Sequence, residues 1–197
     1  MDVKTATAYL RALSRSLLAT HVTDGQGSVL PIDEGAQRAG ALINGVRSAG
    51  GTVMLIGNGG SAAIASHLQN DLCKTAGVRA MVFTESPLLT ALSNDNGYGS
   101  IFERSIDLWA RSGDLLLAIS SSGRSENILR GVKASLGKGC QVITLSGFRA
   151  DNPLRRMGHL NFYVASDVYG YVEVAHSALV HFLADYAADR RGEGNQA

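Results

Sequence analysis

The feature that most constrains the fold is a series of short, almost wholly apolar runs, bounded by glycine or polar residues, that recurs along the chain. Runs of this kind indicate strands buried on both faces of a sheet. Because stretches with helical spacing separate them, the pattern predicts an α/β fold with a doubly wound, parallel, five-stranded sheet flanked by helices. The expected strands are 52–56, 80–83, 115–119, 142–145 and 162–164, and the expected helices are 61–74, 100–110, 126–136 and 172–188.

The chain divides into three parts on this pattern. Residues 1–50 are expected to form an N-terminal helical extension, with helices at about 3–18 and 33–48 and a glycine-containing linker between them. The α/β domain follows at 51–190. The last segment, 191–197, is polar and has no apolar side chain large enough to anchor it, so we expect a disordered tail.

Charge and composition exclude several classes of function. Lys and Arg number 18 against 17 acidic residues, so a formal charge of +1 provides no broad electrostatic surface for nucleic acid or an anionic membrane. No apolar run reaches membrane-spanning length, and the first residues do not resemble a secretion signal. The two cysteines form neither a disulfide framework nor a zinc motif. We therefore expect a soluble cytoplasmic protein with neither nucleic-acid nor membrane partners.

Two strand-to-helix loops carry the pattern of an anion site. Residues 57–62 read Gly-Asn-Gly-Gly-Ser-Ala, and 120–127 read Ser-Ser-Ser-Gly-Arg-Ser-Glu-Asn. Glycines bring backbone N–H groups close to a ligand, a helix N-terminus adds partial positive charge, and serines add donors. Serine-capped turns would look similar, but two such loops at equivalent strand ends favour an anion site. The absence of a P-loop lysine favours a phosphate monoester, so no nucleotide cofactor is expected.

The first loop also matches the dinucleotide fingerprint G-x-G-x-x-A. The only candidate for its ribose-binding acid is Glu85, which comes late, and the chain leaves little room for a separate substrate domain. An oxidoreductase is therefore a minor alternative.

Two helices carry groups suited to proton transfer. His67 and Asp71 stand at i and i+4, on one face of the helix after the first loop, while Glu173 and His181 lie on the last helix. If the two helices meet, these four side chains would supply an acid–base pair or a zinc-like site. The lone histidines His159 and His176 are more typical of packed or surface positions. The segment 93–99 is a turn pattern rich in groups that could bind sugar hydroxyls.

Five motifs occur together and in a fixed order: 57–61, 94–98, 113–116, 120–127 and the C-terminal Glu-x-x-His-x-x-x-x-His at 173–181. With them the chain resembles the phosphoheptose isomerase group of SIS-domain sugar isomerases over nearly its whole length. The resemblance implies an aldose–ketose isomerase that interconverts sedoheptulose 7-phosphate and a D-glycero-D-manno-heptose 7-phosphate. It also implies a homotetramer with shared active sites, and Zn²⁺ in some members.

The resemblance assigns roles to individual positions. The implied substrate-binding residues, which include two loop glycines, are Asn58, Gly59, Gly60, Ser61, Asp95, Ser120, Ser121, Ser122 and Ser125. The implied catalytic residues are Asp71 and His181, and the implied metal ligands are His67, Asp71, Glu173 and His181.

Three positions depart from the family pattern. Asp71 stands where the family has its catalytic glutamate, Asn70 replaces the preceding acid, and Glu173 replaces a metal-binding glutamine. A shorter carboxylate could act only through water or a metal unless the helix sits closer, and an added negative charge would favour a cation. These changes leave open a different substrate, a metal-dependent variant, or a non-catalytic SIS protein that binds phosphosugars or regulates, for example by binding a replication initiator.

Overall fold

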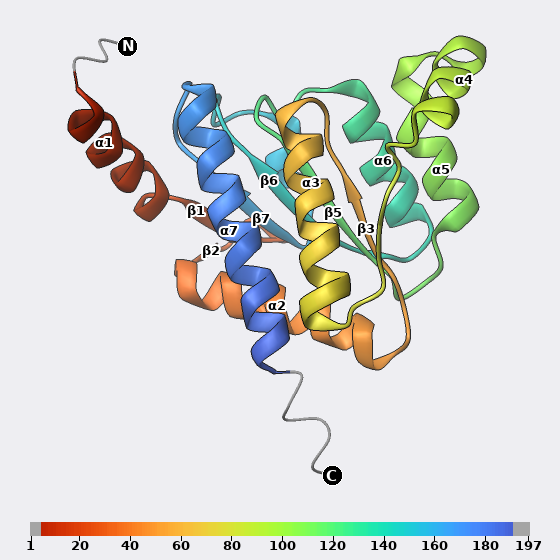
Figure 1. The fold of residues 1–197 in the computed structure, drawn as a ribbon, viewed down its shortest axis with the longest axis horizontal. Helices are drawn as coiled ribbons and strands as arrows, with labels where there is room; N and C mark the ends of the chain where they lie inside the picture. Colours follow the sequence, from red (N-terminus) through yellow and green to blue (C-terminus); the bar gives the residue numbers. More distant parts are fainter. Residues whose placement is uncertain (1–4, 191–197) are drawn as a thin grey trace.

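A computed structural model describes residues 5–190 of the chain, so the tail predicted at 191–197 lies outside the described residues (Figure 1). A single sheet with strand order β2-β1-β7-β6-β5-β3-β4 lies between two layers of helices. The strands are β1 His21–Asp24, β2 Val29–Leu30, β3 Val53–Ile56, β4 Ala80–Val82, β5 Leu115–Ser120, β6 Gln141–Ser146 and β7 Leu160–Tyr163. The α-helices are α1 Ala6–Leu18, α2 Ile32–Ser48, α3 Gly60–Asp71, α4 Ser86–Asn96, α5 Ile101–Trp109, α6 Glu126–Gly137 and α7 Tyr169–Asp189.

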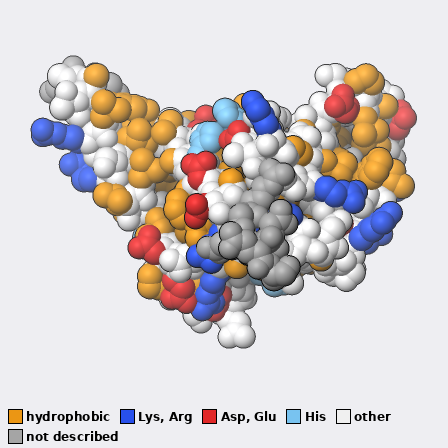
Figure 2. Space-filling model, turned by 60° about the horizontal axis from the view of Figure 1, so that its bottom comes forward, with side chains coloured by type: hydrophobic (Ala, Val, Ile, Leu, Met, Phe, Trp, Pro, Cys, Tyr) orange, Lys and Arg blue, Asp and Glu red, His pale blue; other side chains and the backbone are white. Residues whose placement is uncertain are grey.

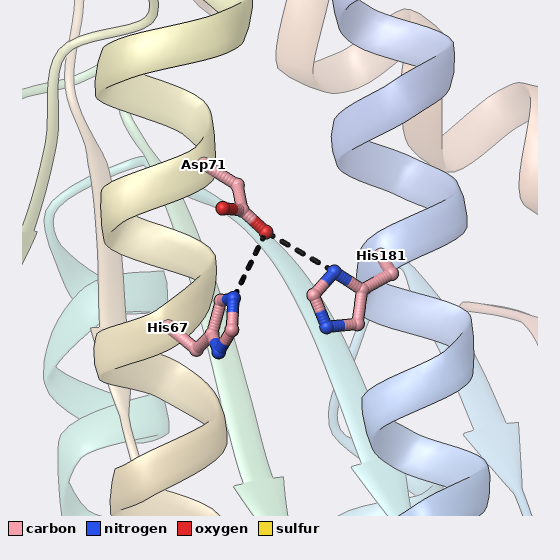
Figure 3. A group of neighbouring side chains, drawn as sticks. All are labelled: His67, Asp71 and His181. Atoms are coloured by element: carbon pink, nitrogen blue, oxygen red, sulfur yellow. Dashed lines mark ion pairs between the residues drawn. The ribbon is translucent and has the colours of Figure 1, made fainter.

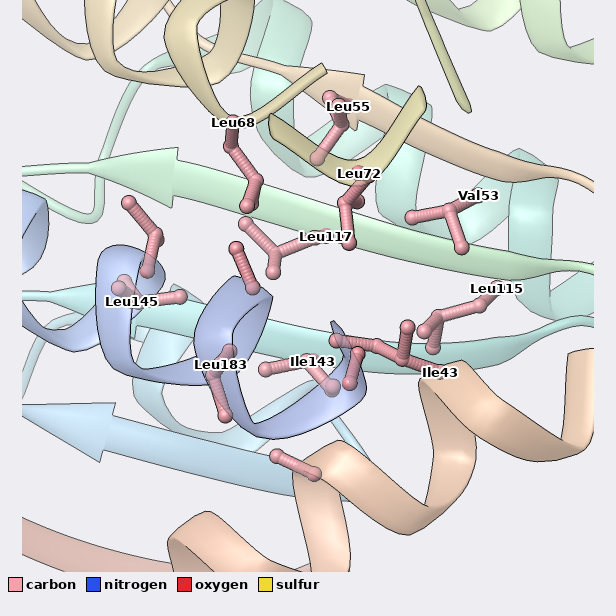
Figure 4. Packing of buried hydrophobic residues seen from close by; sticks show 14 of the residues in the cluster. Ile43, Val53, Leu55, Leu68, Leu72, Leu115, Leu117, Ile143, Leu145 and Leu183 are labelled. Atoms are coloured by element: carbon pink, nitrogen blue, oxygen red, sulfur yellow. The ribbon is translucent and has the colours of Figure 1, made fainter. Parts of the chain in front are cut away.

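The five predicted parallel strands are all confirmed, in the order β7-β6-β5-β3-β4. Their apolar side chains alternate between the two faces, as a pleated strand requires. On one face, Leu55 and Leu117 pack with α2, α3 and α7, as Figure 4 shows, while Met54 and Leu116 face a second cluster with α5 and α6. Burial on both faces explains why these runs contain almost no polar residue.

The interpretation of the segment between α1 and α2 as a linker is wrong. Its residues form the β1–β2 hairpin, and β1 pairs antiparallel with β7 through Val22 and Phe162, which widens the sheet to seven strands. The Asp24 side chain shapes the turn by accepting hydrogen bonds from the N–H groups of Gln26 and Ser28 at 2.9 Å. The helices predicted on either side of the hairpin are present.

The turn predicted at 93–99 is largely helical. Helix α4 continues to Asn96. Gly97 follows with φ 79°, and a short 3₁₀ turn, Tyr98–Ser100, comes next. Helix α4 buries none of its residues and projects from the body beside α5 (Figure 1). Its last turn consists of Ser93, Asn94, Asp95 and Asn96, residue types that favour turns, which explains why the sequence did not reveal it.

Helix α1 also projects from the body and contains no fully buried residue. Figure 2 shows hydrophobic side chains along this arm, at the left of the view, and Leu10 and Leu18 on it are 60% and 80% exposed. Tyr9 and Leu17 pack against the body, but an amphipathic helix that leaves other large apolar side chains this exposed is typical of an interaction surface. Between residues 5 and 190, no helix is both long and apolar enough to cross a membrane.

Candidate active site

The two anion loops lie side by side where the order of the strands reverses. Strand β3 is followed by β4 on one side, and β5 then returns to pair with β3 on the other. In open α/β sheets, ligands bind at this point, beyond the carboxyl ends of the strands. A pocket of about 130 Å³ is present there. It is lined by Asn58, Ser61, Ser120, Ser121, Ser122, Ser125, Tyr169 and Glu173, and below we call it the serine pocket.

The first loop is tightly wound because its glycines permit it. A methyl group on Gly57 would lie 2.5 Å from the backbone oxygen of Ser61, and Gly59 has φ 53°. Gly59 is also the N-cap residue of α3, so no side chain caps this helix, and Ser61 lies inside its first turn. The N-terminus of α3 therefore faces the serine pocket without a hydrogen bond from an N-cap side chain, and the Glu173 carboxylate lies against its first residue, Gly60.

The second loop is held by its own hydroxyls. The Ser120 Oγ lies 3.5 Å from Ser122 Oγ and 3.4 Å from Ser125 Oγ, and it accepts a 3.2 Å hydrogen bond from Gly123 N–H. Ser121 differs, because its Oγ is buried without a hydrogen-bond partner among the described residues. A buried hydroxyl without a partner costs free energy, and its position in the lining leaves it available to a polar ligand.

An amide pair joins the two loops. Asn58 and Asn127 exchange two hydrogen bonds of 2.9 Å, and Asn58 Oδ1 also accepts one of 2.9 Å from the Tyr98 hydroxyl. The side-chain amide of Asn58 is therefore used to align the loops. Asn127 and Tyr98 were not predicted as site residues, although both stand in motifs that the sequence displays.

Helices α3 and α7 meet, which the sequence alone left open. Figure 3 shows Asp71 between two imidazoles: its Oδ2 lies 3.1 Å from His181 Nδ1 and 3.6 Å from His67 Nε2. The two rings are edge to face, with centroids 4.7 Å apart. Aspartate is shorter than glutamate, yet here it reaches His181. Immediately after Asp71 the helix widens into a π-helical turn, Leu72–Ala76.

The donor set of His67, Asp71 and His181 fits a zinc ion. One ligand atom from each residue lies within 4.8 Å of the others, and all three side chains are at least partly accessible. Two imidazole nitrogens and a carboxylate oxygen are ligands that zinc accepts, with a fourth position open in catalytic sites. Glu173, the fourth predicted ligand, lies outside this group and lines the serine pocket instead.

The remaining predicted groups lie elsewhere. Asp95 is exposed on the last turn of α4, where its Oδ1 accepts a hydrogen bond from Asn94, and it is absent from the lining of the serine pocket. His159 is structural, since its Nδ1 accepts a hydrogen bond from Val142 N–H. His176 is fully buried, and its Nε2–H donates to the carbonyl of Ser146 at 3.1 Å. Both lone histidines thus confirm the packed or surface interpretation.

Comparison with known proteins agrees with this fold. The SIS domain model matches residues 31–147. The phosphoheptose isomerase of Rhodospirillum rubrum is 36% identical over 160 residues, covering 78% of this chain and 84% of that one. The solved phosphoheptose isomerase GmhA from Neisseria gonorrhoeae superimposes with a TM-score of 0.79 at 27% identity, covering 91% of this chain and 95% of that one. One from Francisella tularensis, at 24% identity and a TM-score of 0.81 over 96% and 99%, shares the fold.

The chain therefore belongs to the SIS domain family. Within that family it groups with the phosphoheptose isomerases, which makes it an aldose–ketose isomerase.

Proposed function

We propose that this protein interconverts sedoheptulose 7-phosphate and a D-glycero-D-manno-heptose 7-phosphate. The observation that carries the proposal is the serine pocket itself, at the point where the strand order reverses, with a helix N-terminus that lacks an N-cap side chain and the unpartnered Ser121 hydroxyl in its lining. These groups suit the phosphate ester. Relatives at 36% and 34% identity that carry the name phosphoheptose isomerase support the choice of sugar.

The reaction needs two groups that exchange protons. In the ketose-to-aldose direction, a base removes a proton from C1 and the C2 carbonyl oxygen gains a proton, which gives an enediol with a C1–C2 double bond. Loss of the O1 proton and return of a proton to C2 complete the aldose. We assign these transfers to Asp71 and His181: one acts at carbon and the other at the oxygens. In metal-free protein, the 3.1 Å separation of Asp71 Oδ2 and His181 Nδ1 allows a proton to pass between them.

We propose that His67, Asp71 and His181 hold a zinc ion. The geometry of their ligand atoms supports this, and Glu173 would have to approach from elsewhere to complete the predicted set. When bound, zinc would polarise the sugar carbonyl and stabilise negative charge on its oxygen. With zinc bound, Asp71 and His181 would each give one atom to the ion and move protons with the other polar atom of the side chain, and the protein groups would still orient the substrate.

We also propose a cytoplasmic homotetramer with shared active sites, as predicted from the resemblance. Support comes from the unburied face of α1 and from Val174 and Phe182 on α7, which are 43% and 46% exposed. A second copy of the chain that covers these side chains would remove apolar surface from water. Light scattering of the purified protein would measure the assembly directly.

Turnover in deuterium oxide tests the catalytic proposal. Purified protein with added zinc should convert sedoheptulose 7-phosphate and incorporate one deuteron from solvent at C2 of the aldose, observed by NMR. Asp71→Asn and His181→Gln should each lower kcat by about 100-fold or more. Asp189→Asn, an equal charge change on the exposed end of α7, should leave the rate unchanged. Ligand-induced thermal stabilisation without turnover or deuterium incorporation would instead support the non-catalytic, regulatory alternative.

A further inference from the structure

A strained residue lies beside the serine pocket. Phe148 is the one non-glycine residue with positive φ, at 57°, in the part of the chain that the structure describes. A bulky residue rarely adopts this conformation, and strain of this kind concentrates at functional sites. Phe148 follows Gly147, in the loop after β6, the strand that pairs with β5.

Specific contacts hold Phe148 in this conformation. Its N–H donates to the Ser166 carbonyl at 2.9 Å, and its carbonyl accepts a hydrogen bond of 2.8 Å from the Tyr163 hydroxyl. The preceding Gly147 donates its N–H to the Ser121 carbonyl at 3.0 Å, and a methyl group on Gly147 would lie 2.6 Å from a Val172 methyl. The loop is thus fixed between the serine loop and α7.

The ring of Phe148 contacts one side chain of the pocket. It meets Tyr169 edge to face, with ring centroids 4.7 Å apart and an interplanar angle of 89°. Tyr169 begins α7, is 62% exposed and lines the serine pocket one turn before Glu173. Without the Phe148 contact, so exposed a ring would sample several rotamers.

The volume of the pocket shows where the rest of a ligand must lie. At about 130 Å³, it is smaller than the roughly 300–1,000 Å³ of sites that enclose a whole small molecule. It accommodates the phosphate end, and the carbon chain must continue past the rim. Tyr169 offers an apolar ring face for C–H groups there, and its hydroxyl can hydrogen-bond to a sugar oxygen.

We propose that Tyr169 contacts the sugar chain of the bound phosphosugar, and that Phe148 is a positioning residue that holds the Tyr169 ring at the rim. This inference rests on the proposed function, because it takes the serine pocket as the phosphate site. The strained backbone of Phe148 then directs its ring from the loop after β6 toward Tyr169 on α7.

Kinetics and binding of single variants test the role of Tyr169. Tyr169→Ala should raise KM for sedoheptulose 7-phosphate about tenfold with little change in kcat, while its affinity for inorganic phosphate, measured by calorimetry, stays within about twofold of wild type. Tyr169→Phe should retain most of the affinity if the ring face carries the contact. An unchanged KM for Tyr169→Ala, with phosphate binding intact, would overturn the proposal.

The role of Phe148 requires a double-mutant cycle. Phe148→Gly removes the ring, which also packs against the core, and relieves the positive φ, so the protein should stay folded with at most a small fall in melting temperature while its KM rises toward that of Tyr169→Ala. The double variant should be no worse than Tyr169→Ala alone, because both changes remove the same contact. Additive effects would overturn the positioning role. If wild-type protein failed to bind inorganic phosphate at all, the proposed function itself would fail, which is a separate outcome.

Discussion

The carboxylate of Glu173 lies against Gly60, the residue at which α3 begins: a methyl group on Gly60 would approach Glu173 Oε1 to 2.5 Å. The same carboxylate lines the serine pocket, whose lining contains no lysine or arginine. An anionic side chain at a helix N-terminus is favourable for the helix, but it occupies the end of the dipole that would otherwise attract a phosphate.

Glu173→Gln should therefore strengthen anion binding in metal-free protein. Removal of one negative charge at this position should raise the affinity for inorganic phosphate by about fivefold to tenfold, measured by calorimetry in the presence of a chelator. Asp189→Asn is the matched control, because it makes the same charge change on α7 about 24 Å further along the helix. Equal effects of the two variants would show that only net charge matters.

Ser121→Ala should separate stability from binding. Since the Ser121 hydroxyl is buried without a protein partner, its loss should leave the free energy of unfolding within about 0.5 kcal/mol of wild type or raise it. Affinity for phosphate should fall by about fivefold or more. Ser135→Ala, at a buried serine of α6 outside the pocket, should leave phosphate affinity unchanged. Normal phosphate binding by Ser121→Ala would contradict the assignment of this hydroxyl.

His67→Gln should weaken zinc binding by at least about tenfold, because it removes one of the three imidazole and carboxylate donors. Competition with a chromophoric chelator measures this affinity without reference to turnover. His21→Gln is the control, since His21 is exposed on β1, outside the cluster. Zinc titrations that coincide for wild type and His67→Gln would rule out this site.

His176 should make the protein less stable as the pH falls from about 6.5 to 4. Desolvation by burial lowers its pKa from 6.5 to about 4, so the unfolded chain binds a proton in this range that the folded chain does not. The contribution of neutral His176 to the free energy of unfolding is fully present above pH 6.5. It is lost, by up to about 3 kcal/mol, as the pH falls and protonation favours the unfolded state. Chemical denaturation at pH 7 and pH 4.5 should show a smaller loss for His176→Gln than for wild type.

The sequence predicts those elements of the fold that leave a pattern in their own residues. Strands β3 and β5 could be located because burial on both faces removes polar residues from them, and the loops after them, which the sequence predicts to bind an anion, do line one pocket. The β1–β2 hairpin could not, because its strands are short and half exposed and its pairing joins Asp24 to Leu160, far away in the sequence.

The candidate site shows the same division. The i, i+4 spacing of His67 and Asp71 predicts their shared face, but the approach of His181 depends on how α7 crosses α3. Glu173 and His181 share a helix, but two turns separate them. Glu173 therefore lines the serine pocket, while His181 joins His67 and Asp71. Spacing along a helix thus identifies candidate side chains, and only the packing of helices decides which of them meet.

The π-helical turn Leu72–Ala76 permits two different requirements to be met by one continuous helix. Upstream, Asp71 must point toward His181; downstream, Leu72 and Ala76 are completely enclosed by the core. Each residue of an α-helix turns the chain by about 100° about the helix axis. Deleting one residue from the π-helical turn would therefore rotate either the Asp71 carboxylate away from His181 or the apolar side chains out of the core. The direction in which the Asp71 side chain points thus depends on the number of residues in the π-helical turn as well as on their identity.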